Sequence, residues 1–239
     1  MSDSITMSAE GSSAAPNYSR IASPIHTLLV LAAEVGLAYR GIHRLSQLQG
    51  TADRMQLCQR TIFFELLMLA LVLVGVRLHG SSLASVLGKR WRSMVEVLRD
   101  AGIGVAFLFA STMLGSVLAG HAGGQDRSVL SMLPQSGLEV GMWIIVSLTA
   151  GVCEEAIYRG YLQRQFTALT KNVPLGIVLS ACMFGIAHAY QGFGRAMQIV
   201  LQGVMSGILA HWRKSVRPGM FAHAIQDILG GLLGRRLGH

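Results

Sequence analysis

The chain has 239 residues, of which 51% are hydrophobic and only 13% are charged. Soluble proteins carry about 25% charged residues, so this composition excludes an ordinary soluble domain and indicates a polytopic membrane protein. The net charge of +8 does not indicate nucleic-acid binding, because Lys and Arg gather in the short segments between apolar runs, as the positive-inside rule expects. The three cysteines have no paired spacing and predict neither a disulfide framework nor a zinc ribbon.

The beginning of the chain differs from the rest. Residues 1–24 are polar and rich in Ser and Ala, without the basic and apolar blocks of a cleaved signal peptide, and they predict a disordered tail. Residues 25–239 are expected to form one membrane helix bundle. The run Ile25–Tyr39 predicts a membrane segment, although it is short for a span, since about 20 residues are normally needed. The run Thr61–Leu78 is strongly apolar apart from Glu65 and Arg77 and is expected to span.

The middle of the chain alternates between basic and apolar segments. Ser81–Asp100 mixes basic residues with Trp, Leu, Val and Met, which predicts either an amphipathic helix at the lipid surface or a solvated basic loop. Ala101–Gly120 predicts a span, and a long helix is expected from Leu138 to about Leu162. Three more helices are predicted: 173 to about 190, Met197–Trp212 and Phe221–Leu233.

These segments predict an all-α fold, a polytopic membrane helix bundle with about six to eight transmembrane segments and an intramembrane polar cavity. Gly203 and Gly207 are spaced as a helix-packing pair. The basic loops at 81–100, 163–172 and 213–219 are expected on the cytoplasmic side. We therefore expect an integral, multi-pass protein of the plasma membrane, or of the inner membrane in a bacterium.

One apolar helix carries charges that are costly in a membrane, in the stretch Gly151-Val-Cys-Glu154-Glu155-Ala-Ile-Tyr-Arg159. A charged group at the centre of such a helix costs about 2.5–3.5 kcal/mol. Glu155 and Arg159 are four apart and can pair on one helical face. Glu154 is rotated by about 100° from Glu155 and is left without that partner.

Two later helices add polar groups of a related kind. His188 lies at the end of Phe184-Gly-Ile-Ala-His188, and His223 and Asp227 are four apart in the last helix. Each feature has a structural explanation, since a single histidine often serves packing and an ion pair can simply hold helices together. Their coincidence on separate membrane helices indicates a common site.

Such a set suits water activation. A buried carboxylate, here Glu154, is a suitable general base, and a neighbouring histidine can hold the same water. A second histidine with an acid can stabilise an oxyanion. The same residues, Glu154, His188, His223 and Asp227, also resemble the ligands of a divalent metal such as zinc, although no H-E-x-x-H motif occurs. Both alternatives remain open at this point.

The ordered motifs Glu154-Glu155-xxx-Arg159, Phe184-xxx-His188 and His223-xxx-Asp227 resemble those of the CPBP intramembrane protease family, over about 138–233. That family includes the CAAX prenyl endopeptidases and membrane proteins linked to bacteriocin processing or immunity. The resemblance implies a membrane-embedded endopeptidase, metal- or glutamate-dependent, in which Glu154 activates water with His188. His223 and Asp227 then face the oxyanion or a metal, and Glu155 and Arg159 brace the site. Many members have Asn where this chain has Asp227.

The leading hypothesis is therefore an intramembrane endopeptidase acting on a membrane-embedded or membrane-associated peptide. Its expected partners are this substrate and the lipid bilayer, and no nucleic acid is expected to bind. A prenylated substrate does not follow from these residues, which describe a catalytic centre and not a pocket. A non-catalytic immunity factor or membrane scaffold is the second hypothesis. A proton-coupled transporter is the third, because intramembrane Glu, His and Asp also form proton relays.

Overall fold

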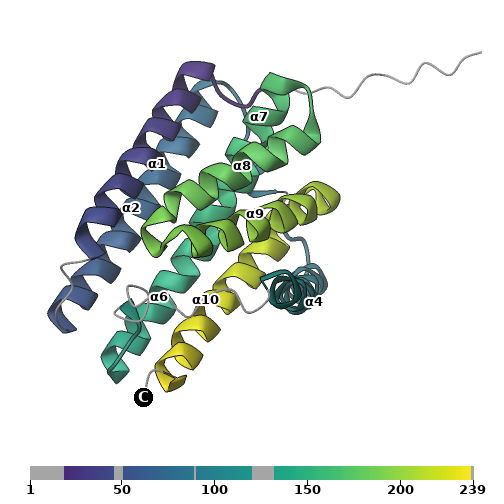
Figure 1. Ribbon diagram of the computed structural model, residues 1–239. Coiled ribbons are helices and arrows are strands. Elements are labelled where there is room, and N and C mark those ends of the chain that lie inside the picture. The colour runs from purple at the N-terminus through teal and green to yellow at the C-terminus, as the bar shows by residue number, and fades with distance from the viewer. Residues whose placement is uncertain (1–18, 46–50, 89, 120–131, 238–239) are drawn as a thin grey trace, which may run out of the picture.

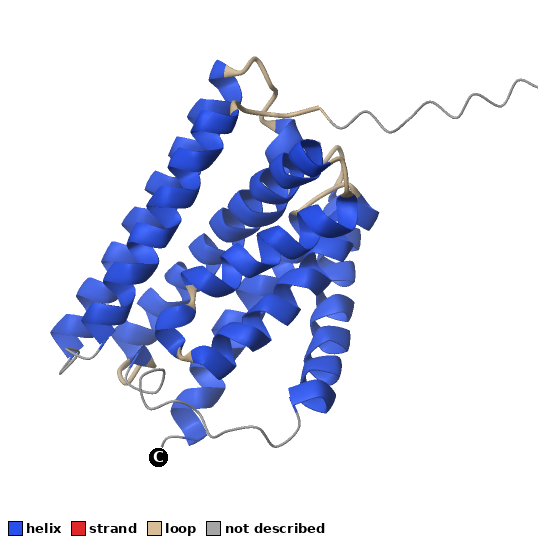
Figure 2. Cartoon of the chain, turned by 45° about the horizontal axis from the view of Figure 1, so that its top comes forward, coloured by secondary structure: helices blue, strands red, loops and turns tan. Residues whose placement is uncertain are grey.

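The computed structural model describes residues 19–45, 51–88, 90–119 and 132–237, and every regular element in these ranges is helical (Figure 2). The elements before the long charged helix are α1 (Pro24–Leu45), α2 (Thr51–Leu78), α3 (Ala84–Leu87) and α4 (Met94–Ala119). Those after it are α6 (Gly137–Glu154), the π-helix η1 (Glu155–Leu162), α7 (Gln163–Thr170), α8 (Val173–Ala187), the 3-10 turn η2 (Ala189–Gln191), α9 (Phe193–Arg213) and α10 (Arg217–Leu237).

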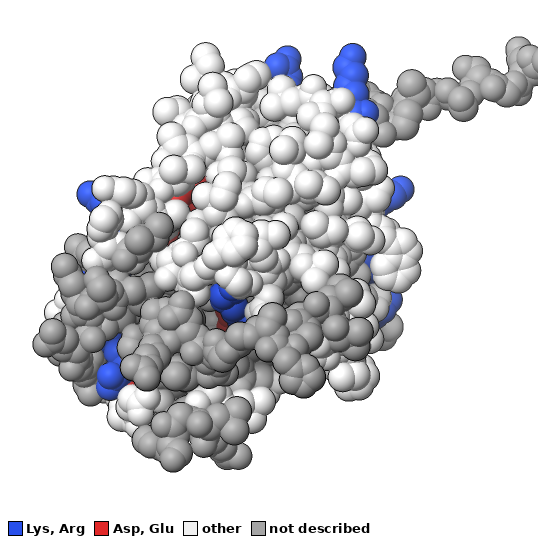
Figure 3. Space-filling model, in the orientation of Figure 1, with Lys and Arg blue, Asp and Glu red and all other residues white. Residues whose placement is uncertain are grey.

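Four stretches of helix in the described ranges are long and apolar enough to cross a membrane: Arg54–Leu78, Met94–Ser116, Gly137–Thr170 and Phe193–Arg213. A fifth apolar helix, Val173–Ala187, is shorter. The all-helical membrane fold is thus confirmed, while the expected six to eight transmembrane segments are not. The surface agrees with lipid exposure, because the face shown in Figure 3 is largely uncharged over the described residues and large apolar side chains such as Phe63, Phe109 and Ile145 are exposed.

The helix α6 lies at the centre of the bundle. It packs against α2 on one side and α10 on the other, and α10 in turn packs against α4. The helices α1 and α2 run side by side along one edge, and α8 and α9 form a second closely packed pair (Figure 1). Together, α6 and its continuation η1 contact α2, α3, α7, α8, α9 and α10.

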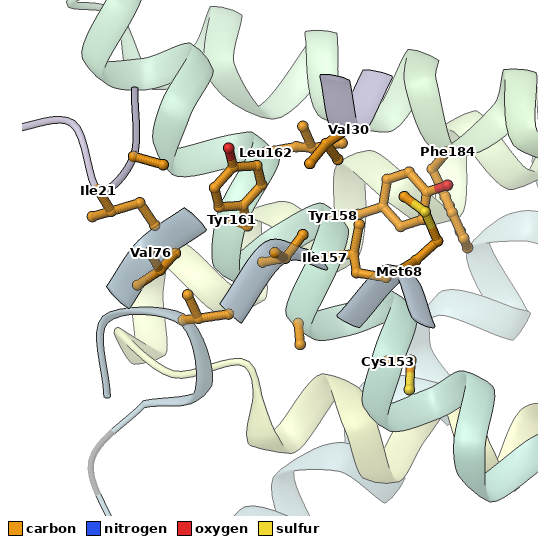
Figure 4. Packing of buried hydrophobic residues seen from close by; sticks show 14 residues of the cluster. Ile21, Val30, Met68, Val76, Cys153, Ile157, Tyr158, Tyr161, Leu162 and Phe184 are labelled. Atoms are coloured by element: carbon orange, nitrogen blue, oxygen red, sulfur yellow. The ribbon is translucent and has the colours of Figure 1, made fainter. Parts of the chain in front are cut away.

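The hydrophobic core gathers around η1. Ile157, Tyr161 and Leu162 are almost completely buried, and they face Val30 of α1 and Val76 of α2 (Figure 4). Because the core is centred on the segment that carries Glu155 and Arg159, packing holds these charged residues rigidly.

The predicted glycine pair packs helix against helix. A Cβ atom on Gly203 would lie 3.0 Å from the Cβ of Ala181 in α8, and one on Gly207 would lie 2.8 Å from Ile177 Cγ2. Small residues let helix backbones approach closely in lipid, and here they bring α9 against α8.

The segment Ser81–Asp100 is not the single amphipathic helix that the sequence allowed. Only the short α3 and the first residues of α4 are helical in it. Gly88, with φ of 82°, follows α3 directly. Ser93 then accepts a hydrogen bond from Glu96 N at the start of α4, which is how a serine caps a helix. The transmembrane helix begins at Met94, earlier than the predicted Ala101.

The first helix, α1, is longer than the predicted run Ile25–Tyr39. Of the expected disordered tail, residues 1–18 lie outside the described residues. Ile21 and Ala22, within the expected tail, are buried, with 4% and 0% of their surface exposed. Gln165 of α7 holds both of them, because its Oε1 accepts from Ile21 N at 2.8 Å and its Nε2 donates to Ala22 O at 3.0 Å.

The basic connections lie at one end of the bundle. Arg164 donates to Ser85 O at 2.5 Å, and Arg217 donates to Gly88 O at 3.3 Å. The three connections at 81–100, 163–172 and 213–219 therefore share one side of the molecule, as alternating topology requires. Their assignment to the cytoplasm stays a prediction.

Candidate active site

The helix that carries the site changes its winding. Ser136 and Glu139 form a capping box at the start of α6, and the helix runs regularly to Glu154 before widening into η1. The sequence predicted a regular helix here. The π-helix is supported by tertiary contacts: Ser180 of α8 donates to Tyr158 O at 2.6 Å, and Gly160 approaches Val86 O so closely that a Cβ would collide with it. π-Helical turns occur frequently at functional sites.

Glu155 and Arg159 form the predicted ion pair. Their closest atoms, Glu155 Oε1 and Arg159 Nη1, are 3.0 Å apart, and the two residues are only 1% and 3% exposed. The guanidinium of Arg159 also lies 4.3 Å from the centre of the Phe184 ring. Desolvating such a pair is costly, and Glu155 Oε2 and both Nη atoms of Arg159 are buried without a hydrogen-bond partner among the described residues, so the attraction between the two charges is what keeps the pair ionised.

His223 is oriented by the same ion pair. Its Nδ1 lies 3.3 Å from Glu155 Oε1, and because that carboxylate is paired with Arg159 it acts as an acceptor, so Nδ1 carries a hydrogen. The other nitrogen, Nε2, lies 3.5 Å from both Glu154 Oε2 and Asp227 Oδ2. Glu155 thus points the reactive nitrogen of His223 toward Glu154.

His188 has an equivalent arrangement on the other side of Glu154. Its Nδ1 is 2.9 Å from Phe184 O, and a carbonyl only accepts, so Nδ1 holds the hydrogen. In the neutral ring Nε2 then carries a lone pair, and it faces Glu154 Oε1 at 3.8 Å. The sequence placed His188 deep within a helix, but the residue follows the last turn of α8, with φ of −102°.

Tyr190 of η2 stacks beside His188, with ring centres 5.9 Å apart. Burial raises the pKa of Tyr190 to about 12, so its phenol stays neutral at pH 7 and adds no charge to this side of the site.

Glu154 is the meeting point of these groups. It is 8% exposed, and its two carboxylate oxygens face the two histidines from α8 and α10. The structure therefore brings together the four residues singled out from the sequence: Glu154, His188, His223 and Asp227. Between Glu154 Oε1 and His188 Nε2, a water molecule can donate one hydrogen to each.

The metal alternative receives no support from the geometry. Among the described residues, no group of three or more His, Cys, Asp or Glu side chains is arranged to hold a metal ion. Nitrogen and carboxylate donors are chemically suited to zinc, but the donor atoms of Glu154, His188, His223 and Asp227 do not converge as a group of three in the described part of the chain.

Three further residues lie near Glu154, and the sequence predicted no role for them in the site. A small cavity with about 50 Å³ of space for water lies beside Glu154. Glu34 of α1, Glu65 of α2 and Tyr158 of η1 also line it. The one signal in the sequence was the presence of Glu34 and Glu65 inside apolar runs, where an ionisable residue indicates function.

The comparison with protein families gives one match. Residues 136–229 match the family model described as type II CAAX prenyl endopeptidase Rce1-like. The match covers less than half of the chain, from the capping box of α6 to the middle of α10, and contains all four residues around Glu154. No curated protein and no solved structure matches the chain. The resemblance to the CPBP family is confirmed for this segment.

Proposed function

We propose that the chain, whose residues 136–229 belong to the Rce1-like family of type II CAAX prenyl endopeptidases, is an intramembrane endopeptidase that uses Glu154 as its general base. The observation that carries the proposal is the position of Glu154 Oε1 opposite His188 Nε2, at 3.8 Å. Two acceptors at this separation are suited to hold one water molecule between them.

The first step is water activation. Glu154 takes a proton from the bound water as the water oxygen forms a bond to the carbonyl carbon of the peptide. The carbonyl π electrons move to its oxygen, which becomes an oxyanion, and His188 Nε2 keeps the second hydrogen of the water in a hydrogen bond. General-base assistance of this kind contributes about 10²–10⁴-fold.

The second step is collapse of the tetrahedral intermediate. The oxyanion electrons reform the carbonyl, the C–N bond breaks, and the proton held by Glu154 passes to the leaving nitrogen. The products are a carboxylic acid and a free amine, and Glu154 returns to its starting state. No step requires a metal or another reactant.

His223 and Asp227 are the candidate oxyanion donors. Nε2–H of a protonated His223 can donate to an oxyanion next to Glu154, and Asp227 can do so only in its acid form, since a carboxylate has no hydrogen to donate. The main-chain carbonyl of Asp227 accepts from Trp143 Nε1 at 2.8 Å, which fixes the turn of α10 that carries both side chains. Removal of one oxyanion donor typically costs about 10²–10³-fold in kcat.

The substrate class follows from the setting of the site and from the family. The site lies within a bundle of apolar helices, which favours a membrane-associated peptide as the substrate. The family name implies a C-terminal segment next to a prenylated cysteine, and the chemistry at Glu154 is independent of that lipid. A farnesylated and an unmodified version of each test peptide distinguish the two substrate types.

The test uses full-length protein purified in detergent and reconstituted in liposomes, assayed with a library of membrane-anchored peptides in both versions. We expect Glu154→Gln and His188→Ala to lower kcat for the cleaved peptides by about 10²–10⁴-fold. Glu96→Gln, a change of the same type in the first turn of α4, is the matched control and should retain full activity. Undiminished cleavage by the Glu154 and His188 variants would contradict the proposal.

A further inference from the structure

The cavity beside Glu154 joins the two halves of the chain. Its acidic side chains come from three different helical segments, with Glu34 in α1, Glu65 in α2 and Glu154 at the end of α6. Its space of about 50 Å³ exceeds the roughly 10–15 Å³ that one water molecule requires. The family match begins at residue 136, so Glu34 and Glu65 lie outside it.

One oxygen of Glu154 lacks a hydrogen-bond partner. Its Oε2 is buried and receives no hydrogen bond from any described residue. The nearest histidine nitrogen, Nε2 of His223, is 3.5 Å away, which is long for a hydrogen bond. A buried carboxylate oxygen without a donor is costly, so this oxygen needs a donor from the cavity.

Glu65 is the acid placed to supply it. Its side chain lines the same small cavity as that of Glu154, which places the two carboxyl groups near each other. Two carboxyl groups that share one enclosed site do not both ionise, because the like charges repel strongly, and one of them keeps a proton. The retained proton forms an O–H donor between the two groups.

Glu34 lies in the same cavity but has a different partner. Its Oε2 accepts a hydrogen bond from Tyr158 OH at 2.7 Å. Tyr158 is 2% exposed and packs on Phe184, with ring centres 4.8 Å apart, so this pair is fixed in place. Because Glu34 is engaged by Tyr158, Glu65 is the acid that is available to donate a hydrogen bond to Glu154.

We propose that Glu65 is a positioning residue of the active site, whose carboxyl group donates a hydrogen bond to Glu154 Oε2 and so holds Oε1 toward His188 Nε2. The inference rests on the proposed function of Glu154. It assigns a role in the site to α2, a helix outside the family match. The donor keeps Glu154 in the orientation that receives the water proton, without contacting the peptide itself.

The test compares three substitutions of Glu65 in the liposome assay. Glu65→Met keeps the length of the side chain and loses the donor, and we expect kcat to fall about 10- to 100-fold with KM unchanged. Glu65→Gln keeps an N–H donor, and we expect it to restore kcat to within about threefold of the parent, since the hydrogen bond is retained. Glu65→Leu replaces the methionine variant if that variant does not fold.

Glu34→Gln is the matched control, because it changes a carboxyl group of the same cavity while the amide oxygen still accepts from Tyr158. It should leave kcat and KM unchanged. A methionine variant as active as the parent overturns the inference, and so does a glutamine variant as impaired as the methionine one. If Glu154→Gln is inactive in these cases, the proposed function stands and only the role of Glu65 fails. A Glu154→Gln variant that is fully active would instead contradict the proposed function itself.

Discussion

Single side chains determine the orientation of the site. Glu155 holds both Arg159, at 3.0 Å, and Nδ1 of His223, at 3.3 Å. Phe184 contributes twice, since its ring lies under the Arg159 guanidinium and its carbonyl accepts from Nδ1 of His188. Both histidines are therefore fixed through Nδ1, and this leaves both Nε2 atoms facing Glu154.

The ion pair of Glu155 and Arg159 is expected to matter for stability as well as for orientation. Arg159→Met removes the partner of a buried carboxylate, and such a change typically costs about 3–5 kcal/mol. The measurement is the free energy of unfolding in detergent, followed by circular dichroism.

Arg99→Met is the control for this variant. Arg99 is 55% exposed at its side chain and lies 3.6 Å from Asp100, which keeps Arg213 and Trp91 as partners when Arg99 is lost, so we expect a cost of about 0–1 kcal/mol. Equal losses in the two variants would show that the buried pair of Glu155 and Arg159 contributes no more than a solvent-exposed arginine does.

At the scale of elements, the site depends on how closely the helices approach. The π-helix η1 places eight consecutive buried residues at the centre of the bundle, and Gly203 and Gly207 bring α9 against α8. Gly151 has a similar position, because a Cβ there would lie 2.9 Å from the Cβ of Ala224 in α10. This contact brings α10, and with it His223, close to α6.

The contact between α8 and α9 can be tested at Gly203. Gly203→Leu inserts a side chain where even a Cβ would lie 3.0 Å from Ala181 Cβ and 3.4 Å from Arg159 Nη2. Overpacking of this kind costs about 1–3 kcal/mol, so we expect the unfolding midpoint in detergent to fall.

Gly194→Leu provides the comparison on the same helix. A Cβ at Gly194 meets nothing within 4 Å, and leucine has a higher helix propensity than glycine by up to about 1 kcal/mol. The Gly194 variant should be as stable as the parent or slightly more so. A Gly203 variant with the same midpoint would contradict close packing at this position.

For the whole molecule, the N-terminal helices complete the bundle around α6 and η1. Gln165 holds the entry to α1 through Ile21, Ala22 and Thr27, whose Oγ1 accepts from Gln165 Nε2 at 2.8 Å. His26 adds a hydrogen bond with Tyr161 OH at 2.6 Å. These contacts hold α1 along the edge of the bundle (Figure 1) and bring Glu34 to the cavity beside Glu154.

Loss of Gln165 should release the start of α1. Gln165→Leu leaves the buried Ile21 N–H and Ala22 C=O without their partner, at a cost of about 1–3 kcal/mol for each unsatisfied group. We expect faster amide hydrogen exchange at residues 21–30 in detergent, measured by mass spectrometry.

Gln198→Leu is the matched change, because Gln198 is exposed on α9 and bonds only to the neighbouring Arg195 among the described residues. It should leave exchange at residues 21–30 unchanged. Unchanged exchange in the Gln165 variant as well would show that α1 is held by packing alone.

Much of this arrangement could be predicted from local pattern. Glu155 and Arg159 are four residues apart, and the pairing expected from that spacing occurs although the segment is a π-helix. The π-helix itself could not be predicted, since it depends on Ser180 and Val86 from other elements. Of the two alternatives for Ser81–Asp100, an amphipathic helix or a solvated basic loop, the single helix does not form, because Gly88 and the Ser93 cap divide that segment. The disordered tail was expected to reach residue 24, and the burial of Ile21 and Ala22 depends on Gln165, far along the chain.

The sequence by itself determined which ionisable groups the membrane bundle carries: Glu154, Glu155 and Arg159 on one helix, with two histidines and an aspartate on two others. The reason is energetic, because ionisable groups in apolar segments require partners and so stand out without any structure. The tertiary structure alone decided which groups meet. It turned both Nε2 atoms toward Glu154, and it brought Glu65 and Glu34 from the first two helices to the cavity beside Glu154, because contacts between distant helices depend on packing that no local spacing encodes.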